Sequence, residues 1–327
     1  MKGAIKYFLI WLFLTVAGAI MFFMIGFIVL DIAGYEIDSV GDMPKNSWLF
    51  SGVFLGIDLL LLLVFWKRRY TRNWIEYGYT YGENFSTAKL CLLAIVGAIG
   101  CLMLDVLVQE YVPIPIDPDL GEFFELLMNN PIGILTVCLT GPLMEEAVFR
   151  GAIERRLLEK NWNPWFAIVI SAVLFAAAHG NYEQGLTAVI IGCFMGWVYY
   201  RTRSIWPTFL IHAFNNTTAV VAAYSLPESM DESLGVPLST GITLIVVSLI
   251  LIYIAARGIG KITNDRTRIP EPVPVGEVLP PPFPGETVVT GTPIDYPQDF
   301  VPTPDFEEAL QAEEQSDDLP MESEPQD

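Results

Sequence analysis

Two adjacent glutamates and an arginine interrupt an otherwise apolar stretch of the chain, GPLMEEAVFRG at residues 141–151. An ionisable side chain inside a bilayer costs about 2.5–3.5 kcal/mol, so each one calls for a partner or a chemical role. The i, i+4 spacing of Glu146 and Arg150 on a helix brings a carboxylate beside a guanidinium, where the two can form an ion pair. Glu145 points about 100° away around the helix and must therefore face another partner.

Two histidines and an asparagine are candidates for that partner. The chain has 2 histidines, and both lie in apolar segments, His179 in FAAAH and His212 in HAFNN. If the intervening NWN turn joins two antiparallel helices, Glu145 and His179 each lie about 22 Å from it and reach the same depth. His212 lies about 13 Å along a third helix, and Asn216 follows it at i+4 on the same face.

This set of side chains suits hydrolysis of an amide bond. A buried glutamate can act as a general base near neutral pH. The two imidazoles can bind a divalent metal ion or orient a water molecule, and the carboxamide can donate to a developing oxyanion. The HExxH pattern of zincin metalloproteases is absent from the sequence, so that arrangement of zinc ligands is excluded.

The motifs EEAVFR, FAAAH and HAFNN match, in order, the EExxxR, FxxxH and HxxxN motifs of a known family. Over about residues 87–224 the chain resembles the CAAX prenyl protease and bacteriocin-processing family, also called the Abi family of intramembrane proteases. The resemblance implies an all-helical bundle of eight spans. It further implies that Glu145 activates the hydrolytic water, that Glu146 and Arg150 support the site, that His179 and His212 hold the water or a zinc ion, and that Asn216 stabilises the oxyanion.

The need for a metal ion is left open by the resemblance. His179, His212 and Glu145, with water in the fourth place, would make a possible zinc site. Metal-independent hydrolysis by Glu145 is the other interpretation.

The elements that carry these motifs are expected to be membrane helices. The chain of 327 residues is 53% hydrophobic, and its mean hydropathy of +0.45 indicates a polytopic membrane protein. About 20 apolar residues suffice to cross a bilayer as a helix. We therefore expect an all-α bundle with about eight spans, near residues 7–30, 47–66, 87–108, 131–153, 164–179, 186–200, 204–224 and 237–256. A cleaved signal peptide is the alternative for the first span, but its apolar run continues to Leu30, which favours an uncleaved helix.

Lysine and arginine accumulate in alternate loops, which orients the bundle. Basic residues occur before the first span, at 67–72, at 155–160, at 201–203 and after the last span. By the positive-inside rule these loops and both termini are cytoplasmic. We expect a multi-pass protein of a bacterial cytoplasmic membrane whose site opens to the cytoplasm, although His179 lies near the outer end of its span and an outward opening stays possible.

Charge and composition divide the chain into three segments. The expected domains are 1–86 with the first two spans, 87–268 with the catalytic membrane part, and a tail at 269–327. All 18 lysines and arginines lie at or before Arg268, whereas 15 of the 37 acids and 13 of the 23 prolines follow it. We expect a disordered acidic tail, able to bind a partner. The net charge of −19 argues against nucleic-acid binding.

Two further acids and a glycine-proline pair lie inside spans. Asp58 and Asp105 are interpreted as structural, either forming hydrogen bonds between helices or lying near a membrane interface. The Gly141-Pro142 pair is expected to kink or restart the fourth helix.

These observations favour an intramembrane endopeptidase that cleaves a membrane-associated or hydrophobic peptide. The first alternative is a non-proteolytic membrane scaffold, or a bacteriocin-immunity or regulatory protein, that binds a partner through the fold and the tail. A proton-coupled carrier is a third interpretation, since it also needs buried ionisable groups. It does not account for Asn216 or for the clustering of the site residues.

Overall fold

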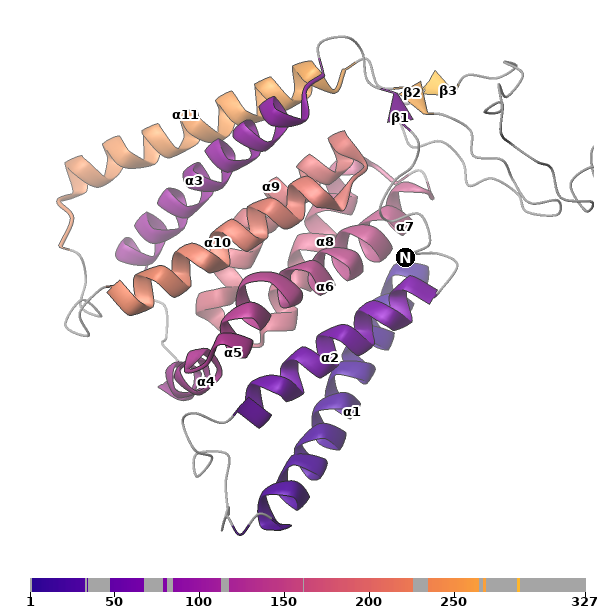
Figure 1. The fold of residues 1–327 in the computed structure, drawn as a ribbon. Coiled ribbons are helices and arrows are strands. Elements are labelled where there is room, and N and C mark those ends of the chain that lie inside the picture. Colours follow the sequence, from indigo (N-terminus) through magenta and orange to yellow (C-terminus); the bar gives the residue numbers. More distant parts are fainter. Residues whose placement is uncertain are drawn as a thin grey trace, which may run out of the picture.

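The computed structural model describes residues 2–32, 34, 48–67, 79–80, 85–112, 118–160, 162–225, 235–264, 267–268 and 287–288. These residues form nine continuous helices and three two-residue strands (Figure 1). The helices before residue 130 are α1 (Lys2–Ile32), α2 (Trp48–Lys67), α3 (Thr87–Tyr111) and α4 (Pro118–Met128). One continuous helix, Pro131–Leu158, comprises α5 (Pro131–Leu135), the π segment η2 (Thr136–Thr140), α6 (Gly141–Val148), the π segment η3 (Phe149–Glu154) and α7 (Arg155–Leu158). The last four helices are α8 (Pro164–His179), α9 (Tyr182–Thr202), α10 (Ile205–Ser225) and α11 (Leu238–Ile262).

Each of the eight expected spans coincides with a helix. Four helices are long and apolar enough to cross a membrane: Gly3–Gly26, Thr87–Tyr111, Pro131–Leu158 and Leu238–Ile262. Shorter apolar helices cover Phe50–Phe65 and Pro164–His179. The described chain is therefore a helical protein with several candidate membrane spans.

Two features differ from the sequence-based expectation. Helix α4 occupies a stretch that we expected to be a loop, because its 11 residues are too few and too acidic to resemble a span. Strands β1 (Tyr79–Thr80), β2 (Thr267–Arg268) and β3 (Thr287–Val288) form a small sheet, with β1 antiparallel to β2 and β2 parallel to β3. Strand β3 belongs to the tail that we expected to be disordered; the rest of 269–327 lies outside the described residues.

Asparagine caps fix the hairpin that presents His179. Asn163 caps the start of α8, because its Oδ1 accepts a hydrogen bond from the amide of Trp165 (2.9 Å). A proline in the first turn also suits the start of a helix. The helix ends at Gly180, which has a left-handed φ of 70° that suits glycine. Asn181 then caps α9 by accepting from the amide of Gln184 (2.8 Å), so the chain reverses directly after His179.

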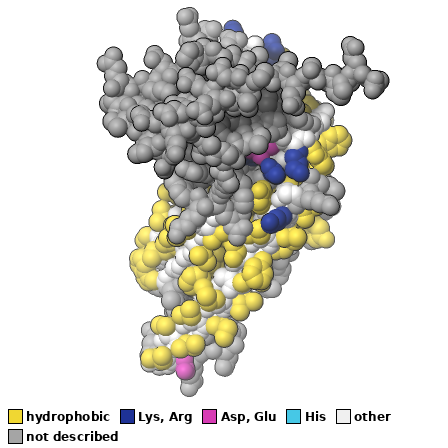
Figure 2. Space-filling view, turned by 90° about the vertical axis from the view of Figure 1, so that its right-hand side faces the viewer, with side chains coloured by type: hydrophobic (Ala, Val, Ile, Leu, Met, Phe, Trp, Pro, Cys, Tyr) yellow, Lys and Arg dark blue, Asp and Glu magenta, His cyan; other side chains and the backbone are white. Residues whose placement is uncertain are grey.

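The continuous helix Pro131–Leu158 occupies the centre of the bundle. It packs against α1, α2, α8, α9 and α10, while α3 and α11 pair with each other beyond α9 and α10 (Figure 1). Half of its most apolar window is buried, compared with 11% for α1. The coloured part of the face in Figure 2 is mostly hydrophobic, with a few lysine and arginine side chains.

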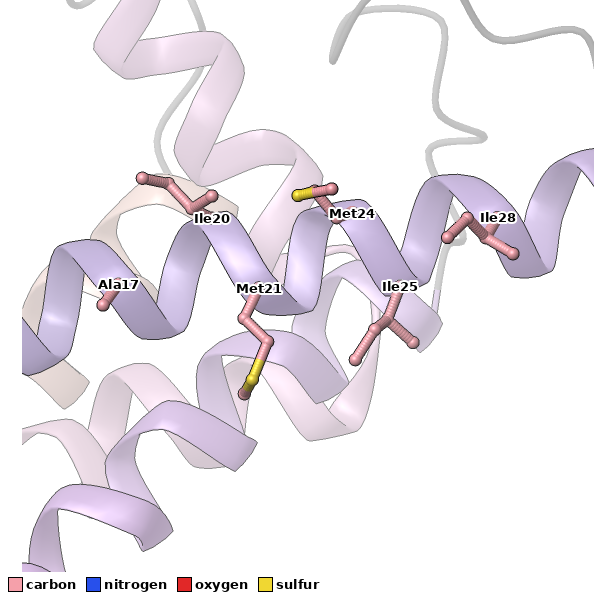
Figure 3. A pocket seen from close by; sticks show the side chains of 6 residues that line it. All are labelled: Ala17, Ile20, Met21, Met24, Ile25 and Ile28. Carbon is pink, nitrogen blue, oxygen red and sulfur yellow. The ribbon is translucent and has the colours of Figure 1, made fainter.

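The outer face of α1 carries a shallow apolar groove. It is lined by Ala17, Ile20, Met21, Met24, Ile25 and Ile28 (Figure 3). None of these side chains is an acid, a base or a nucleophile, so the groove is not a candidate for the chemistry considered above.

Candidate active site

Two π segments bracket the glutamate pair on the central helix. In the first, the amide of Gly141 donates to the carbonyl of Thr136, five residues back. The next residue, Pro142, has no amide hydrogen, so the carbonyl of Val137 cannot bond to the matching amide five residues ahead. The glycine-proline pair was expected to kink or restart the helix; in the structure it instead lies at a π turn within one continuous helix.

The side chain of Asn216 on α10 bonds to the Val137 carbonyl, which the π turn leaves without this backbone partner. Its Nδ2 donates to the Val137 oxygen at 2.9 Å, and its Oδ1 accepts from Asn215 Nδ2 at 3.2 Å. The asparagine expected at the oxyanion therefore also ties α10 to the turn that precedes the glutamates. One of its two amide hydrogens is used in this bond.

Glu146 and Arg150 form the ion pair that their spacing predicts. The side chains are both 0% exposed, and Arg150 Nη1 lies 2.8 Å from Glu146 Oε1. A second guanidinium nitrogen, Nη2, donates to the carbonyl of Gly192 on α9 (3.1 Å). A Cβ atom at Gly192 would lie 3.4 Å from this nitrogen, so the glycine lets the α9 backbone approach the guanidinium.

His212 lies between the two glutamates. Its Nδ1 is 3.1 Å from Glu146 Oε1, and its Nε2 is 3.5 Å from Glu145 Oε2. A proton on Nδ1 would donate to Glu146 and leave the Nε2 lone pair facing Glu145. His212 and Glu146 are buried, whereas the side chain of Glu145 is 24% exposed. Glu145 is thus the member of the group that water can reach.

His179 packs against an aromatic ring, that of Phe175, which also contacts His212. The two rings are 4.9 Å apart at their centroids, and the His212 ring is 5.4 Å from Phe175 on a similar edge-on geometry. His179 Nδ1 bonds to the backbone carbonyl of Phe175 at 2.9 Å, so Nε2 is the nitrogen left for other partners. No hydrogen bond or ion pair joins His179 to Glu145, and both residues are described.

Phe175 itself was missed as a site residue. Besides the two imidazoles, it contacts the Phe149 ring (5.1 Å) and lies 4.8 Å from the Arg150 guanidinium carbon, a cation–π distance. Its position four residues before His179 in FAAAH was the available signal, because i and i+4 share a helix face. The Phe175 ring thus contacts both imidazoles and the Arg150 guanidinium.

The zinc hypothesis was tested against the donor geometry. Within the described part of the chain, no three His, Cys, Asp or Glu side chains are grouped closely enough to hold a metal ion. Glu145 and His212 are adjacent, but His179 has no hydrogen bond or ion pair with either carboxylate and its Nδ1 is engaged by the Phe175 carbonyl. In this arrangement the three residues do not fit a zinc site.

Both acids that were interpreted as structural do form hydrogen bonds between helices. Asp58 Oδ2 on α2 accepts from Thr140 Oγ1 in the π turn (3.0 Å). Asp105 Oδ2 on α3 accepts from Thr187 Oγ1 on α9 (2.9 Å) and from Gln109 Nε2 (3.0 Å). The interpretation of both acids is confirmed.

The central part of the chain is similar to a known protein family. Residues 128–218 match the family described as type II CAAX prenyl endopeptidase Rce1-like, a narrower range than the 87–224 expected from the motifs. All six expected site residues fall within it. No solved structure matches the chain.

Two curated relatives are similar over the same region. "Putative membrane peptidase YdiL" of Bacillus subtilis (strain 168) is 34% identical over 97 residues, which are 30% of this chain and 39% of that protein. "Membrane-embedded CAAX protease MroQ" of Staphylococcus aureus (strain USA300) is 27% identical over 133 residues, 39% of this chain and 54% of that protein. The chain thus spans less than two thirds of the length of either relative. Residues 128–218 are thus similar to the Rce1-like, type II CAAX prenyl endopeptidase family.

Proposed function

We propose that this protein is an intramembrane endopeptidase that hydrolyses a peptide bond of a membrane-associated or hydrophobic protein. One observation carries the proposal: Glu145 is a partly exposed carboxylate 3.5 Å from a buried imidazole that is itself held by a buried ion pair. This is the arrangement of a general base with an orienting partner. The names of the relatives support a peptidase, and the substrate class is our proposal.

In the proposed reaction, the Glu145 carboxylate accepts a proton from a water molecule while the water oxygen attacks the carbonyl carbon of the peptide bond. The π electrons of the carbonyl move to its oxygen and produce a tetrahedral oxyanion. The C–N bond then breaks, and protonated Glu145 returns its proton to the leaving nitrogen. The products are a carboxyl and an amino group, and Glu145 is restored.

The other residues hold this water and the developing charge. His212 orients the water, while the Glu146–Arg150 pair fixes the imidazole through its Nδ1 contact. The unengaged Nε2 of His179 offers a second contact to the water. The amide hydrogen of Asn216 that Val137 does not use is proposed as a donor to the oxyanion.

We further propose that all eight apolar helices cross a bacterial cytoplasmic membrane, with both termini and the opening of the site on the cytoplasmic side. Support comes from the alternation of basic loops and from the apolar outer surfaces of α1 and α11. Reporter fusions at residues 112 and 226 would report the outer side, and a fusion at 161 the inner side. Reversed signals would refute this orientation.

The test of the proposed activity compares wild type with Glu145→Gln in cleavage of a quenched hydrophobic peptide library by the full chain in nanodiscs. The substitution keeps the size and removes the base, so we expect cleavage to fall by about 10²–10⁴-fold. Glu110→Gln is the control, since Glu110 accepts from the amide of Val236 at 3.2 Å and glutamine keeps an acceptor. Equal cleavage by wild type and Glu145→Gln would refute the role of Glu145. No cleavage by folded wild type would favour the scaffold.

A further inference from the structure

The π turn Thr136–Thr140 sets the direction of the side chains that follow it. A π turn contains about one residue more than an α turn, so converting it to an α turn would rotate the helix beyond it by about 100°. Glu145 and Glu146 are themselves about 100° apart. Arg150 lies beyond the turn and rotates with them, so the turn sets the direction in which both glutamates face His212 on α10.

The hydroxyl of Thr140, the last residue of this turn, donates to a side chain of another helix. Thr15, Thr136, Thr202, Thr218 and Thr243 each donate to the backbone carbonyl four residues earlier in their own helix. Thr140 instead donates to Asp58 Oδ2 on α2 at 3.0 Å. This hydrogen bond links the π turn of the central helix to α2.

Asp58 is buried against the start of α6. Its residue exposure is 7%, and a Cβ atom at Gly141 would lie 3.7 Å from its Oδ2. Asp58 and Glu145 are also close enough to interact electrostatically. Glu145 follows Gly141 at i+4 on the same helix face, so one acid on α2 faces the part of the helix that carries the proposed base.

We propose that Asp58 is a positioning residue of the site: by holding Thr140 it keeps the π turn in place and so directs Glu145 and Glu146 towards His212. Asp58 lies outside the segment 128–218 that matches the family. Helix α2 would then supply part of the working site from outside the family domain. The catalytic half of this inference rests on the proposed function, whereas the structural half does not.

Asp105 and Thr187 provide a matched control. They form the same kind of pair, an aspartate on one helix and a threonine on another, at 2.9 Å. Asp105 is 6% exposed, close to the value for Asp58. Neither residue adjoins the π turn, so loss of this pair removes an equivalent bond without releasing the glutamates.

The first test follows the imidazole signals of the site by NMR and does not require enzymatic activity. The chain has 2 histidines, so isotope-labelled histidine gives two imidazole signals by NMR, which His179→Gln assigns. We expect Thr140→Val and Asp58→Leu to shift the His212 signal beyond its linewidth, because both glutamates that contact this ring would move. Thr140→Ser and Asp58→Asn, which keep a donor and an acceptor, should restore the wild-type position. Thr187→Val should leave it unchanged.

The second test uses peptide cleavage in the same nanodiscs. Thr140→Val and Asp58→Leu should lower kcat by about 10-fold with KM within about 2-fold, and Thr140→Ser should recover kcat. A His212 signal that is unmoved in Thr140→Val, or that moves equally in Thr187→Val, would overturn the proposal. If Asp58→Leu does not fold, Thr140→Val decides the question alone. Absence of cleavage by wild type would refute the proposed function, while the NMR result would still decide the role of Asp58.

Discussion

The central helix Pro131–Leu158 and the peripheral helix Leu238–Ile262 are both long enough to cross a bilayer, yet they meet very different surroundings. Over its most apolar 18 residues, the central helix is 50% buried and has a mean hydropathy of 1.5. Over the corresponding 18 residues, the peripheral helix is 17% buried and has a mean hydropathy of 2.4. The less apolar helix is thus the one enclosed by protein, because neighbouring helices can supply partners for its charges whereas lipid cannot.

The difference also shows which contacts carry stability. On the central helix, Arg150 and Glu146 are fully buried together, and Ser171 on α8 donates to the carbonyl of Phe149 at 3.0 Å. On the peripheral helix, Thr243 and Ser248 bond to carbonyls of their own helix. Substitutions on the two helices should therefore differ in effect even where the residue type is the same.

The largest effect is expected from Arg150→Met, which leaves the buried Glu146 carboxylate without its guanidinium partner. Breaking a buried ion pair from one side costs about 3–5 kcal/mol of unfolding free energy. Arg156→Met is the control, because Arg156 pairs with Glu159 at 3.2 Å but is 41% exposed in its side chain, so its loss costs about 0–1 kcal/mol. SDS titration of the purified protein measures both. Similar losses for the two variants would contradict the special status of the buried pair.

A smaller effect is expected from Ile153→Ala on the central helix, where the side chain is 0% exposed. Truncation of a buried isoleucine costs about 2–5 kcal/mol in water-soluble cores. We expect the lower half of this range, because apolar side chains gain little from leaving lipid for protein and mainly packing is lost. Ile250→Ala on α11, 49% exposed, should change the same unfolding free energy by less than about 0.5 kcal/mol. If the unfolding free energy falls by the same amount in both variants, Ile250 on α11 is packed against protein and the prediction is wrong.

The smallest of the three effects is expected from Gly133→Ala. A Cβ atom there would collide with the Leu127 carbonyl and lie 2.8 Å from Ser51 Oγ, so overpacking should cost about 1–3 kcal/mol. Gly260 on α11 has nothing within 4 Å of such an atom, and Gly260→Ala should be neutral or slightly stabilising. Thermal unfolding in detergent compares the two. A neutral Gly133→Ala would show that α4 and α5 can separate at little cost.

Much of the fold could be predicted because membrane helices are a local property of the chain. A bilayer requires about 20 apolar residues in a row, and this requirement is readable without knowing any neighbour. The helix α8 was predicted with its observed bounds, Pro164–His179. Helix α4 was not predicted, because its length and acidity fit no span and only its packing against α2 and α5 places it in the bundle.

The site was predictable in its members more than in its contacts. The i, i+4 spacing determined the Glu146–Arg150 pair, because helix geometry alone brings those side chains together. The meeting of Glu145 and His179 across the hairpin was inferred from depth, and depth does not fix rotation about the helix axis. In the structure, Glu145 contacts His212 instead, and both imidazoles pack against Phe175.

The sequence by itself determined the eight apolar helices, the ion pair and the identity of the acids, imidazoles and amide that the proposed chemistry uses. Only the tertiary structure decided that a π turn precedes Glu145 and Glu146, and that Asp58 and Asn216 bond to that turn from two other helices. The physical reason is range. Apolar length and i, i+4 spacing act within one helix, whereas a π turn persists only where side chains distant in sequence satisfy the backbone groups that it displaces.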